Sequence, residues 1–147
     1  MIELKELTKE EYPEVKELFR SVFMSPPWND DWSDGQQLDD YLKDLMQVRI
    51  PVDLGLYEDG RLVGISIGCI KHWCLGTEYF IDEFCISSDC QGRGLGKRFL
   101  ELIEEYLISR DIHQIFLMTQ KSMPACGFYK HFGFNEVGGL TSFFKEF

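Results

Sequence analysis

Hydrophobic residues recur along the chain at the two spacings that distinguish strands from helices. Alternation of apolar and polar residues predicts strands over residues 2–7, 52–57, 62–73 and 79–86. Apolar residues three and four apart predict helices over residues 8–23, 34–45, 97–110 and 124–132. A β-branched apolar run predicts a buried strand over residues 112–119, and weaker patterns predict short strands around residue 137 and over 142–145.

Local signals mark where several of these elements begin and end. Thr8 followed by Glu11 forms a capping box that begins the first helix, and Ser33 or Asp34 can cap the second. Residues 58–60 read Glu-Asp-Gly, a hairpin turn, and Gly133 occupies a helix C-cap position. The order of elements predicts one α/β domain spanning residues 1–147.

Composition places the chain among folded proteins. A hydrophobic fraction of 44% with 12 Phe argues against disorder, and 147 residues can bury a real core. The N-terminal region lacks the basic start and apolar run of a signal peptide, and no apolar stretch approaches the roughly 18 residues that span a bilayer. We therefore expect a soluble, cytoplasmic protein without a membrane partner.

Charge and cysteine content argue against nucleic-acid-binding, disulfide-rich and metal-binding proteins. A net charge of −10 disfavours nucleic-acid binding, which needs clustered Lys and Arg, but suits a cationic substrate. The 5 Cys are odd in number and suggest no disulfide framework. Cys69, His72 and Cys74 are close in sequence, but strand alternation separates their side chains, so we expect no metal site.

A glycine-rich turn between a predicted strand and a predicted helix is the strongest chemical signal. Gly92, Gly94 and Gly96 allow a positive φ and a close approach of the backbone to a ligand. The helix that follows presents unpaired N–H groups and the positive end of its dipole. Lys97 and Arg98 would oppose that dipole unless an anion lies there, so the turn predicts a phosphate site.

Three kinds of phosphate loop compete for this turn. A Walker A loop needs one more residue between Gly92 and Gly96, and Arg98 stands where its hydroxyl should be. A dinucleotide fingerprint needs G-x-G-x-x-G rather than the observed G-x-G-x-G. The pattern [RQ]-x-x-G-x-[GA], met from Gln91 onward, resembles the acetyl-CoA loop of the GNAT superfamily of N-acetyltransferases.

The resemblance extends over residues 79–134, the cofactor-binding half of a GNAT enzyme. Residues 125–134 resemble that family's A-x-x-[FL]-Y-x-x-x-G-F segment. The resemblance implies a mixed, mostly antiparallel sheet, flanked by helices and splayed at the acetyl-CoA site. It also implies acetyl-CoA as cosubstrate, with main-chain groups of the fourth strand along the pantetheine arm and those of the loop on the pyrophosphate. The implied cofactor-binding residues are Phe84, Cys85, Ile86, Gln91, Gly92, Arg93, Gly94, Leu95, Gly96 and Lys97.

Transfer of an acetyl group to an amine needs a base and an oxyanion donor, and an acid helps the thiolate to leave, although a thiol pKa near 8.5 makes that help useful rather than indispensable. By resemblance, Tyr129 protonates the departing thiolate, and a main-chain N–H at Ile86 or a neighbour stabilises the oxyanion. For the base, alternation places Asp82 on one strand face with Phe80, Phe84 and Ile86, and we expect it to act directly or through water. Glu83 is the alternative, because a β-bulge would reverse the parity.

The acceptor and the oligomeric state stay open at this stage. Residues 24–32 and the second helix are expected to form one wall of the acceptor cleft, where Trp side chains beside carboxylates suit a small-molecule or peptide amine. A non-catalytic acyl-CoA sensor is the alternative function, and a nucleotide-binding protein is a third. Exposed aromatic residues near the C-terminus leave room for a homodimer: Phe143, Phe144 and Phe147.

Overall fold

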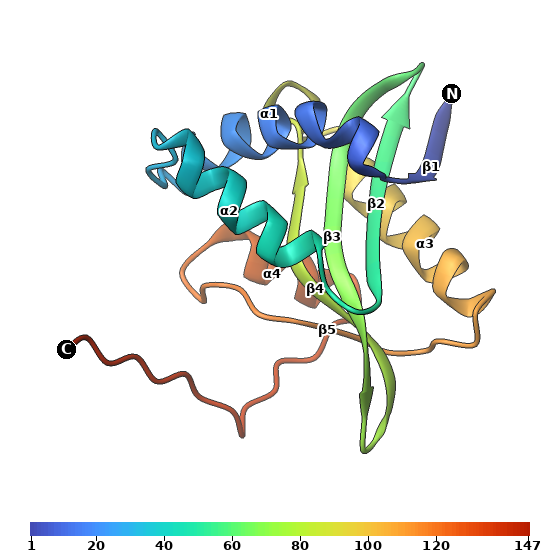
Figure 1. Cartoon of the computed structure of the whole chain (residues 1–147). Coiled ribbons are helices and arrows are strands. Elements are labelled where there is room, and N and C mark those ends of the chain that lie inside the picture. The colour runs from blue at the N-terminus through green and yellow to red at the C-terminus, as the bar shows by residue number, and fades with distance from the viewer.

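One five-stranded sheet organises the computed structural model, which describes residues 1–147 (Figure 1). Its strand order is β1-β2-β3-β4-β5. The strands are β1 (Ile2–Glu6), β2 (Pro51–Glu58), β3 (Arg61–Trp73), β4 (Gly76–Ile86) and β5 (Ile115–Leu117). All neighbours are antiparallel except β4 and β5, which run parallel. The expected mixed, mostly antiparallel sheet is confirmed.

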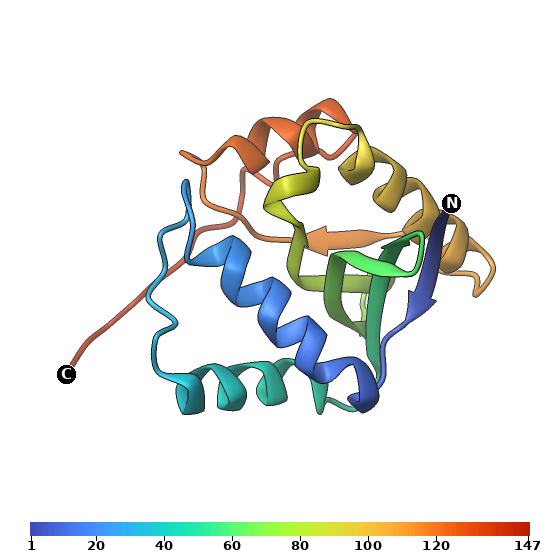
Figure 2. The ribbon, with the colours of Figure 1, turned by 90° about the horizontal axis from the view of Figure 1, so that it is seen from above.

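Helices cover both faces of this sheet. They are α1 (Tyr12–Phe23), α2 (Gly35–Met46), α3 (Leu95–Ile108) and α4 (Pro124–His131), with short 3-10 turns η1 (Lys9–Glu11) and η2 (Ser88–Cys90). The view from above shows α1 and α2 on one side of the sheet and α3 on the other (Figure 2). The order of elements therefore follows the sequence pattern up to α4.

The predicted local signals explain several boundaries. Thr8 and Glu11 form the expected capping box, with the Thr8 N–H donating to the Glu11 carboxylate at 2.8 Å. Asp34, rather than Ser33, caps α2 by accepting from two backbone N–H groups at 3.0 and 3.2 Å. Asp59 and Gly60 both adopt positive φ, as a tight hairpin turn requires.

The sheet separates two hydrophobic cores. Helices α1 and α2 bury their apolar faces on one side against Ile65, Ile67 and Cys85. Helix α3 buries its apolar face on the other side against Val63, Tyr79 and Ile81. The largest fully buried side chains of both cores are Val15, Phe19, Leu38, Leu42, Leu54, Leu56, Ile65, Ile67, Tyr79, Ile81, Phe99 and Ile103.

A β-bulge at Asp82 corrects the predicted face assignment of β4. Ile67 of β3 pairs with Glu83 and the next residue, Gly68, pairs with Ile81, so Asp82 has no partner in the ladder. Because an extra residue reverses the alternation, Ile81 and Cys85 face opposite cores. The expectation that unbroken alternation places Phe80, Asp82, Phe84 and Ile86 on one face is wrong. Glu83 and Cys85 lie on the α1/α2 side.

The C-terminal third of the chain holds less strand than the sequence suggests. Strand β5 has three residues, not the eight of the apolar run, and pairs only with Tyr79, Phe80 and Ile81. The rest of β4 is unpaired on that edge, so the sheet is splayed, as the resemblance implies. No strand forms after α4, because the segment there runs away from the sheet edge and finds no partner (Figure 1).

No helix combines the length and apolar character needed to cross a membrane. A cytoplasmic location stays a prediction.

Candidate functional site

The glycine-rich turn presents a row of unsatisfied backbone donors. Gly92 and Gly94 adopt φ values of +78° and +77°, and Gly94 is the N-cap of α3 without a side-chain cap. The first helical hydrogen bond runs from the N–H of Arg98 to the carbonyl of Gly94. The N–H groups of residues 92–97 therefore lack a protein acceptor, and a Cβ built on either positive-φ glycine meets no atom within 4 Å. This open backbone surface fits an anion such as a pyrophosphate.

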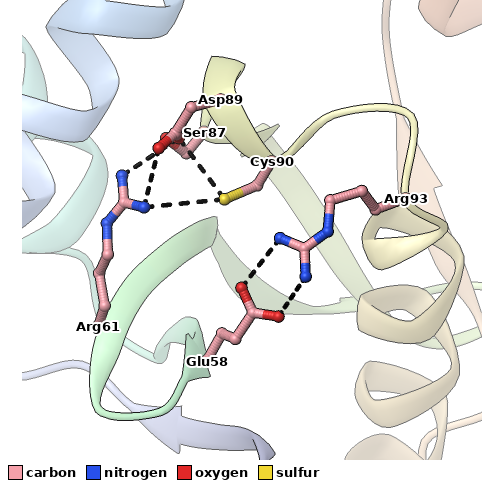
Figure 3. Close-up of polar contacts among 6 residues, drawn as sticks. All are labelled: Glu58, Arg61, Ser87, Asp89, Cys90 and Arg93. Atoms are coloured by element: carbon pink, nitrogen blue, oxygen red, sulfur yellow. Dashed lines mark hydrogen bonds and ion pairs between the residues drawn. The ribbon is translucent and has the colours of Figure 1, made fainter.

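Basic side chains around the turn are engaged elsewhere. Arg93 makes a two-pronged contact with the Glu58 carboxylate at the end of β2, one bond measuring 3.0 Å (Figure 3). Lys97 and Arg98 lie along α3 toward Glu101, at 3.8 and 3.5 Å. The turn therefore offers an anion mainly backbone N–H groups and the helix dipole.

A second ion pair fixes the start of the turn. Arg61, on the hairpin between β2 and β3, contacts Asp89 at 2.9 Å, and Asp89 also accepts a hydrogen bond from the Ser87 hydroxyl (Figure 3). These contacts hold the pKa of Asp89 below its usual range. Gln91 donates from its side-chain amide to the carbonyl of Ile86 at 3.1 Å. The turn is thus attached to β2, β3 and β4 before any ligand binds.

The open edge of β4 presents main-chain groups beside the turn. The Ser87 N–H donates to the Val63 carbonyl at 2.7 Å, so the alternate residue Cys85 also directs its main chain toward β3. The main-chain groups of Phe84 and Ile86 then face the splayed side. Cys85, by contrast, directs its main chain toward its partner Ile65 on β3 and away from that edge. Of the three strand residues expected to contact a cosubstrate, two lie on the open edge.

A cleft of about 390 Å³ occupies the gap between β4 and the segment that follows β5. Its lining includes three carboxylates, those of Asp30, Asp82 and Glu83, and no Lys, Arg or His. The remaining lining residues are Phe23, Trp28, Ile81, Phe84, Leu117, Met118, Thr119, Gln120, Ala125, Tyr129 and Ser142. The cleft therefore brings the three residues expected to be catalytic, Asp82, Glu83 and Tyr129, to one place.

Of the two carboxylates expected as the base, Glu83 is the one whose orientation a hydrogen bond fixes. Its Oε1 accepts a hydrogen bond from the Tyr41 hydroxyl of α2 at 2.6 Å. Burial raises the pKa of Glu83 to about 7, although the Tyr41 hydrogen bond opposes the shift by stabilising the carboxylate. A carboxylate with a pKa near neutrality is suited to accept a proton at physiological pH.

Asp82 and Asp53 complete an acidic group around the bulge. Burial raises the pKa of Asp82, and the nearby Lys71 ammonium opposes that shift. Asp53 on β2 is 9% exposed, and the N–H of Gly68 donates to it at 3.4 Å. Burial raises the pKa of Asp53 to about 7, and the charge of Asp82 adds to the effect. The bulge thus gathers three carboxylates from two strands.

Tyr129 reaches the same cleft from α4. Its ring packs edge-on against Phe84, Phe128 and Phe134, with centroid distances of 6.2, 5.4 and 5.3 Å. Burial raises the pKa of the Tyr129 hydroxyl. That hydroxyl keeps its proton at neutral pH and makes no hydrogen bond to the protein, so it is free to donate into the cleft.

An aromatic wall closes the α1/α2 side of the cleft, where residues 24–32 are expected to lie. Trp28 packs on Phe23 with a centroid distance of 5.5 Å, and the N–H of Asp30 donates to the Phe23 carbonyl at 2.8 Å. Trp32 stacks on Tyr41 at 5.1 Å. Of these two Trp residues, only Trp28 reaches the cleft.

Sequence reasoning missed three contributors to this site. Tyr41 stands on the apolar face of α2, where a tyrosine gives no sign of its distant partner. Asp53 could have been found from the sequence, because a carboxylate inside an otherwise apolar, buried strand indicates a functional or paired group. Glu58 holds Arg93 across the fold, and only the three-dimensional arrangement reveals that contact.

The comparison with protein families gives one match that spans nearly all of this architecture. The model of the Acetyltransferase (GNAT) family matches residues 3–134, from β1 through Phe134 after α4. No curated protein sequence matches the chain. The matched region contains the turn, Tyr129 and every residue that lines the cleft except Ser142.

Solved structures share the fold at low sequence identity. An integron cassette protein from the mobile metagenome of V. cholerae has a TM-score of 0.78 and 17% identity, covering 99% of this chain and 92% of its own. The ribosomal-protein-alanine N-acetyltransferase from Brucella melitensis biovar Abortus 2308 has a TM-score of 0.73 and 20% identity, covering 100% of both chains. AAC(6')-Iy, solved with the bisubstrate analogue CoA-S-monomethyl-acetylneamine, has a TM-score of 0.74 and 14% identity, covering 99% of both. At these identities the similarity concerns the fold.

Proposed function

Because this chain belongs to the GNAT acetyltransferase family, whose acetyl donor is acetyl-CoA, we propose that it acetylates a cationic primary amine bound in the cleft between β4 and the segment that follows β5. The observation that carries the proposal is the meeting of Glu83 and Tyr129 in one cleft that adjoins the open edge of β4. The acid-and-base pair and the acceptor class are inferences from that geometry.

Binding of the donor follows from groups that the fold leaves unsatisfied. Acetyl-CoA supplies the activated thioester. The free N–H groups of residues 92–97 are suited to its pyrophosphate, and the open main chain of Phe84 and Ile86 is suited to its amide-containing arm. Gly96 lets α3 approach α4 closely, since a Cβ there would lie 3.1 Å from the Phe128 ring. We propose that this approach keeps the Tyr129 hydroxyl, which lines the cleft, within reach of the thioester sulfur.

The reaction is proposed as direct attack by the amine. Glu83, held by Tyr41, accepts the proton of the ammonium directly or through water, because an alkyl ammonium has no lone pair for attack. A main-chain N–H on the open edge of β4, at Phe84 or Ile86, stabilises the oxyanion. Tyr129 donates a proton to the departing thiolate. Asp82, at the bulge, is proposed to contribute negative charge rather than to act as the base.

The acceptor class follows from the charge of the cleft. Three carboxylates and no cationic side chain line it, so an acceptor with its own carboxylate would meet uncompensated repulsion. Trp28 beside Asp30 offers an aromatic face and a carboxylate to a second ammonium group. We therefore expect di- or polyamines, and other amines that carry more than one positive charge, to be better acceptors than amino acids.

Two measurements test this function. Acetyl-CoA should raise the midpoint of thermal unfolding, since a ligand at about 100 times its Kd stabilises by roughly 2.7 kcal/mol, while ATP and NAD should not. Mass spectrometry should then detect acetylated products from polycationic amines, at a rate reduced in Glu83→Gln. Absence of any shift with acetyl-CoA would overturn the proposal. A shift without product from any amine would instead favour the alternative function, a non-catalytic acyl-CoA sensor.

A further inference from the structure

Two stacked phenylalanine rings lie directly beside the acidic cleft. Phe80 of β4 pairs with Phe116 of β5, and the ring centroids are 5.5 Å apart. The next pair along these strands, Ile81 and Leu117, already belongs to the lining of the cleft. Both rings are partly exposed. Phe80 and Phe116 therefore form an aromatic strip that leads from the cleft toward the hairpin between β3 and β4, which projects below α1 and α2 in Figure 1.

Lys71 of β3 places a positive charge on the aromatic strip. Its ammonium nitrogen lies 3.8 Å from the centroid of the Phe80 ring, which is a cation–π contact. Alternation along β3 puts Lys71 on the same face as Ile65 and Ile67, which belong to the core under α1 and α2. Glu78, the cross-strand partner of Lys71, forms no ion pair with it and lines a groove beside the end of α3 instead. The Lys71 charge is therefore not neutralised by its nearest carboxylate in the ladder.

The cleft thus has two ends of opposite charge. At one end Trp28 and Asp30 present an aromatic ring and a carboxylate. At the other end the aromatic strip leads to the ammonium of Lys71. At about 3.3 Å per strand residue, Phe80 lies roughly 10 Å from Glu83. An amine that reacts beside Glu83 and carries a long chain can send that chain toward either end.

We propose that Lys71 is a specificity-determining residue, which repels the distal ammonium of a long polyamine from the aromatic strip and so directs the chain toward Asp30. This inference rests on the function proposed above. An aromatic face attracts ammonium groups, and here a tethered ammonium already occupies that face. A second positive charge would meet Lys71 there at close range, whereas at the other end it would meet a carboxylate and an aromatic ring.

The proposed role distinguishes acceptors by their distal charge and not by their length alone. Diaminooctane and octylamine have the same chain, but only diaminooctane carries a distal ammonium. Loss of the Lys71 charge should therefore favour diaminooctane and leave octylamine unaffected. Diaminopropane should also be unaffected, because its second ammonium is too close to the first to reach the aromatic strip.

Steady-state kinetics on the full chain test the proposal. The ratio of kcat/KM for diaminooctane to that for octylamine should rise about three- to fivefold in Lys71→Gln and about tenfold or more in Lys71→Glu, which reverses the charge. Lys5→Glu is the matched control, because the Lys5 ammonium also lies over an aromatic ring, 4.8 Å from the Tyr57 centroid, but belongs to β1 at the opposite edge of the sheet. High salt should reduce the gain, since it screens exposed charges. Thermal unfolding checks that each variant is folded.

The possible outcomes separate this inference from the proposed function. A ratio that stays unchanged in both Lys71 variants, while the wild type is active, would overturn the role of Lys71 alone. An equal gain with octylamine and diaminooctane would also overturn it, because a general change of the site would explain that gain without repulsion of a distal charge. A protein that acetylates none of the three amines would overturn the proposed function and this inference together.

Photolabelling reports the direction of the chain without catalysis. Diaminooctane with a diazirine beside its distal amine is irradiated with the protein and CoA, and the labelled peptides are identified by mass spectrometry. We expect label on residues 23–32 in the wild type, and on peptides of β3 and β5 in Lys71→Glu. Label on β3 and β5 in the wild type would contradict the proposal.

Discussion

The Tyr41 hydroxyl donates a hydrogen bond to the Glu83 carboxylate at 2.6 Å, and this contact joins α2 to the bulged strand β4. Glu83 is half-buried beside Asp82 and Asp30, whose charges raise its pKa further. The Tyr41 hydrogen bond is the one contact that favours the ionised form. This hydrogen bond therefore lowers the pKa of Glu83, which burial raises to about 7, and it fixes the orientation of the carboxylate in the cleft.

Tyr41→Phe should shift the acidic limb of the pH–rate profile to higher pH. A hydrogen bond to a charged group is worth about 1.5–3 kcal/mol, so its loss should raise the pKa of Glu83 by roughly one unit or more. Since the base acts only when deprotonated, kcat/KM near pH 6 should fall about tenfold, with little change near pH 9. Tyr106→Phe, which removes a 2.6 Å hydrogen bond to Glu6 far from the cleft, is the control. An unshifted profile in Tyr41→Phe would contradict the role of Glu83.

Tyr129→Phe should lower kcat more than it changes the KM for acetyl-CoA. The ring would keep its edge-on packing against Phe84 and Phe134, so only the proton donor is lost. We expect a loss of about 10- to 100-fold, because a leaving thiol with a pKa near 8.5 needs only moderate help. Steady-state kinetics with the best polyamine measure this. Tyr12→Phe serves as control, and an unchanged kcat in Tyr129→Phe would remove Tyr129 from the mechanism.

Gly94→Ala should weaken acetyl-CoA binding without unfolding the protein. A φ of +77° costs an L-residue roughly 1–2 kcal/mol, so the turn would relax and misplace its N–H groups. Gly35→Ala is the matched control, since Gly35 begins α2 without a positive φ and its added Cβ meets only ordinary contacts. Isothermal titration calorimetry should find about a tenfold or greater loss of affinity in Gly94→Ala alone. Equal affinities would argue against anion binding at this turn.

Asp53→Asn should stabilise the fold at alkaline pH. Burial raises the pKa of Asp53 from 3.8 to about 7, so the native state retains a proton that the unfolded state releases. The free energy of unfolding therefore falls as the pH rises from about 4 to 7, by at most roughly 4 kcal/mol. Asparagine stays neutral and can still accept from Gly68.

Urea unfolding at pH 4.5 and pH 8 measures the effect. The two proteins should be nearly equal at the lower pH, and the variant should be the more stable at the higher pH. Asp44→Asn, a change at an exposed carboxylate of α2, should make little difference at either pH. A variant less stable than wild type at pH 8 would show that the Asp53 carboxylate is stabilising as an anion.

Local signals were enough to predict most of the fold. Three of these signals are the capping box at Thr8, the turn at Asp59–Gly60 and the glycines before α3. Each depends on only a few neighbouring residues, so the local sequence is enough to predict the structure that it forms. The predictions of a long strand over residues 112–119 and of short strands after α4 are wrong for a different reason. A strand forms only where a partner offers its edge, and the apolar pattern of one segment does not reveal where that edge lies.

The candidate site divides in the same way. The turn and Tyr129 belong to local motifs, and the sequence located both. The position and pKa of the Glu83 carboxylate depend on Tyr41, which is 42 residues away in the chain. They also depend on a bulge that arises where β3 pairs with β4. Periodicity favoured Asp82 over Glu83, since it assumes an unbroken ladder.

The bulge at Asp82 also means that β4 could lose one residue without turning its side chains over. Deletion of Asp82 would make Glu83 follow Ile81 directly in the ladder, where their partners Ile67 and Gly68 are already neighbours. Ile81 would still face the core under α3, and Cys85 would still face α1 and α2. The unpaired residue therefore adds a carboxylate to the cleft without changing which core its neighbours face.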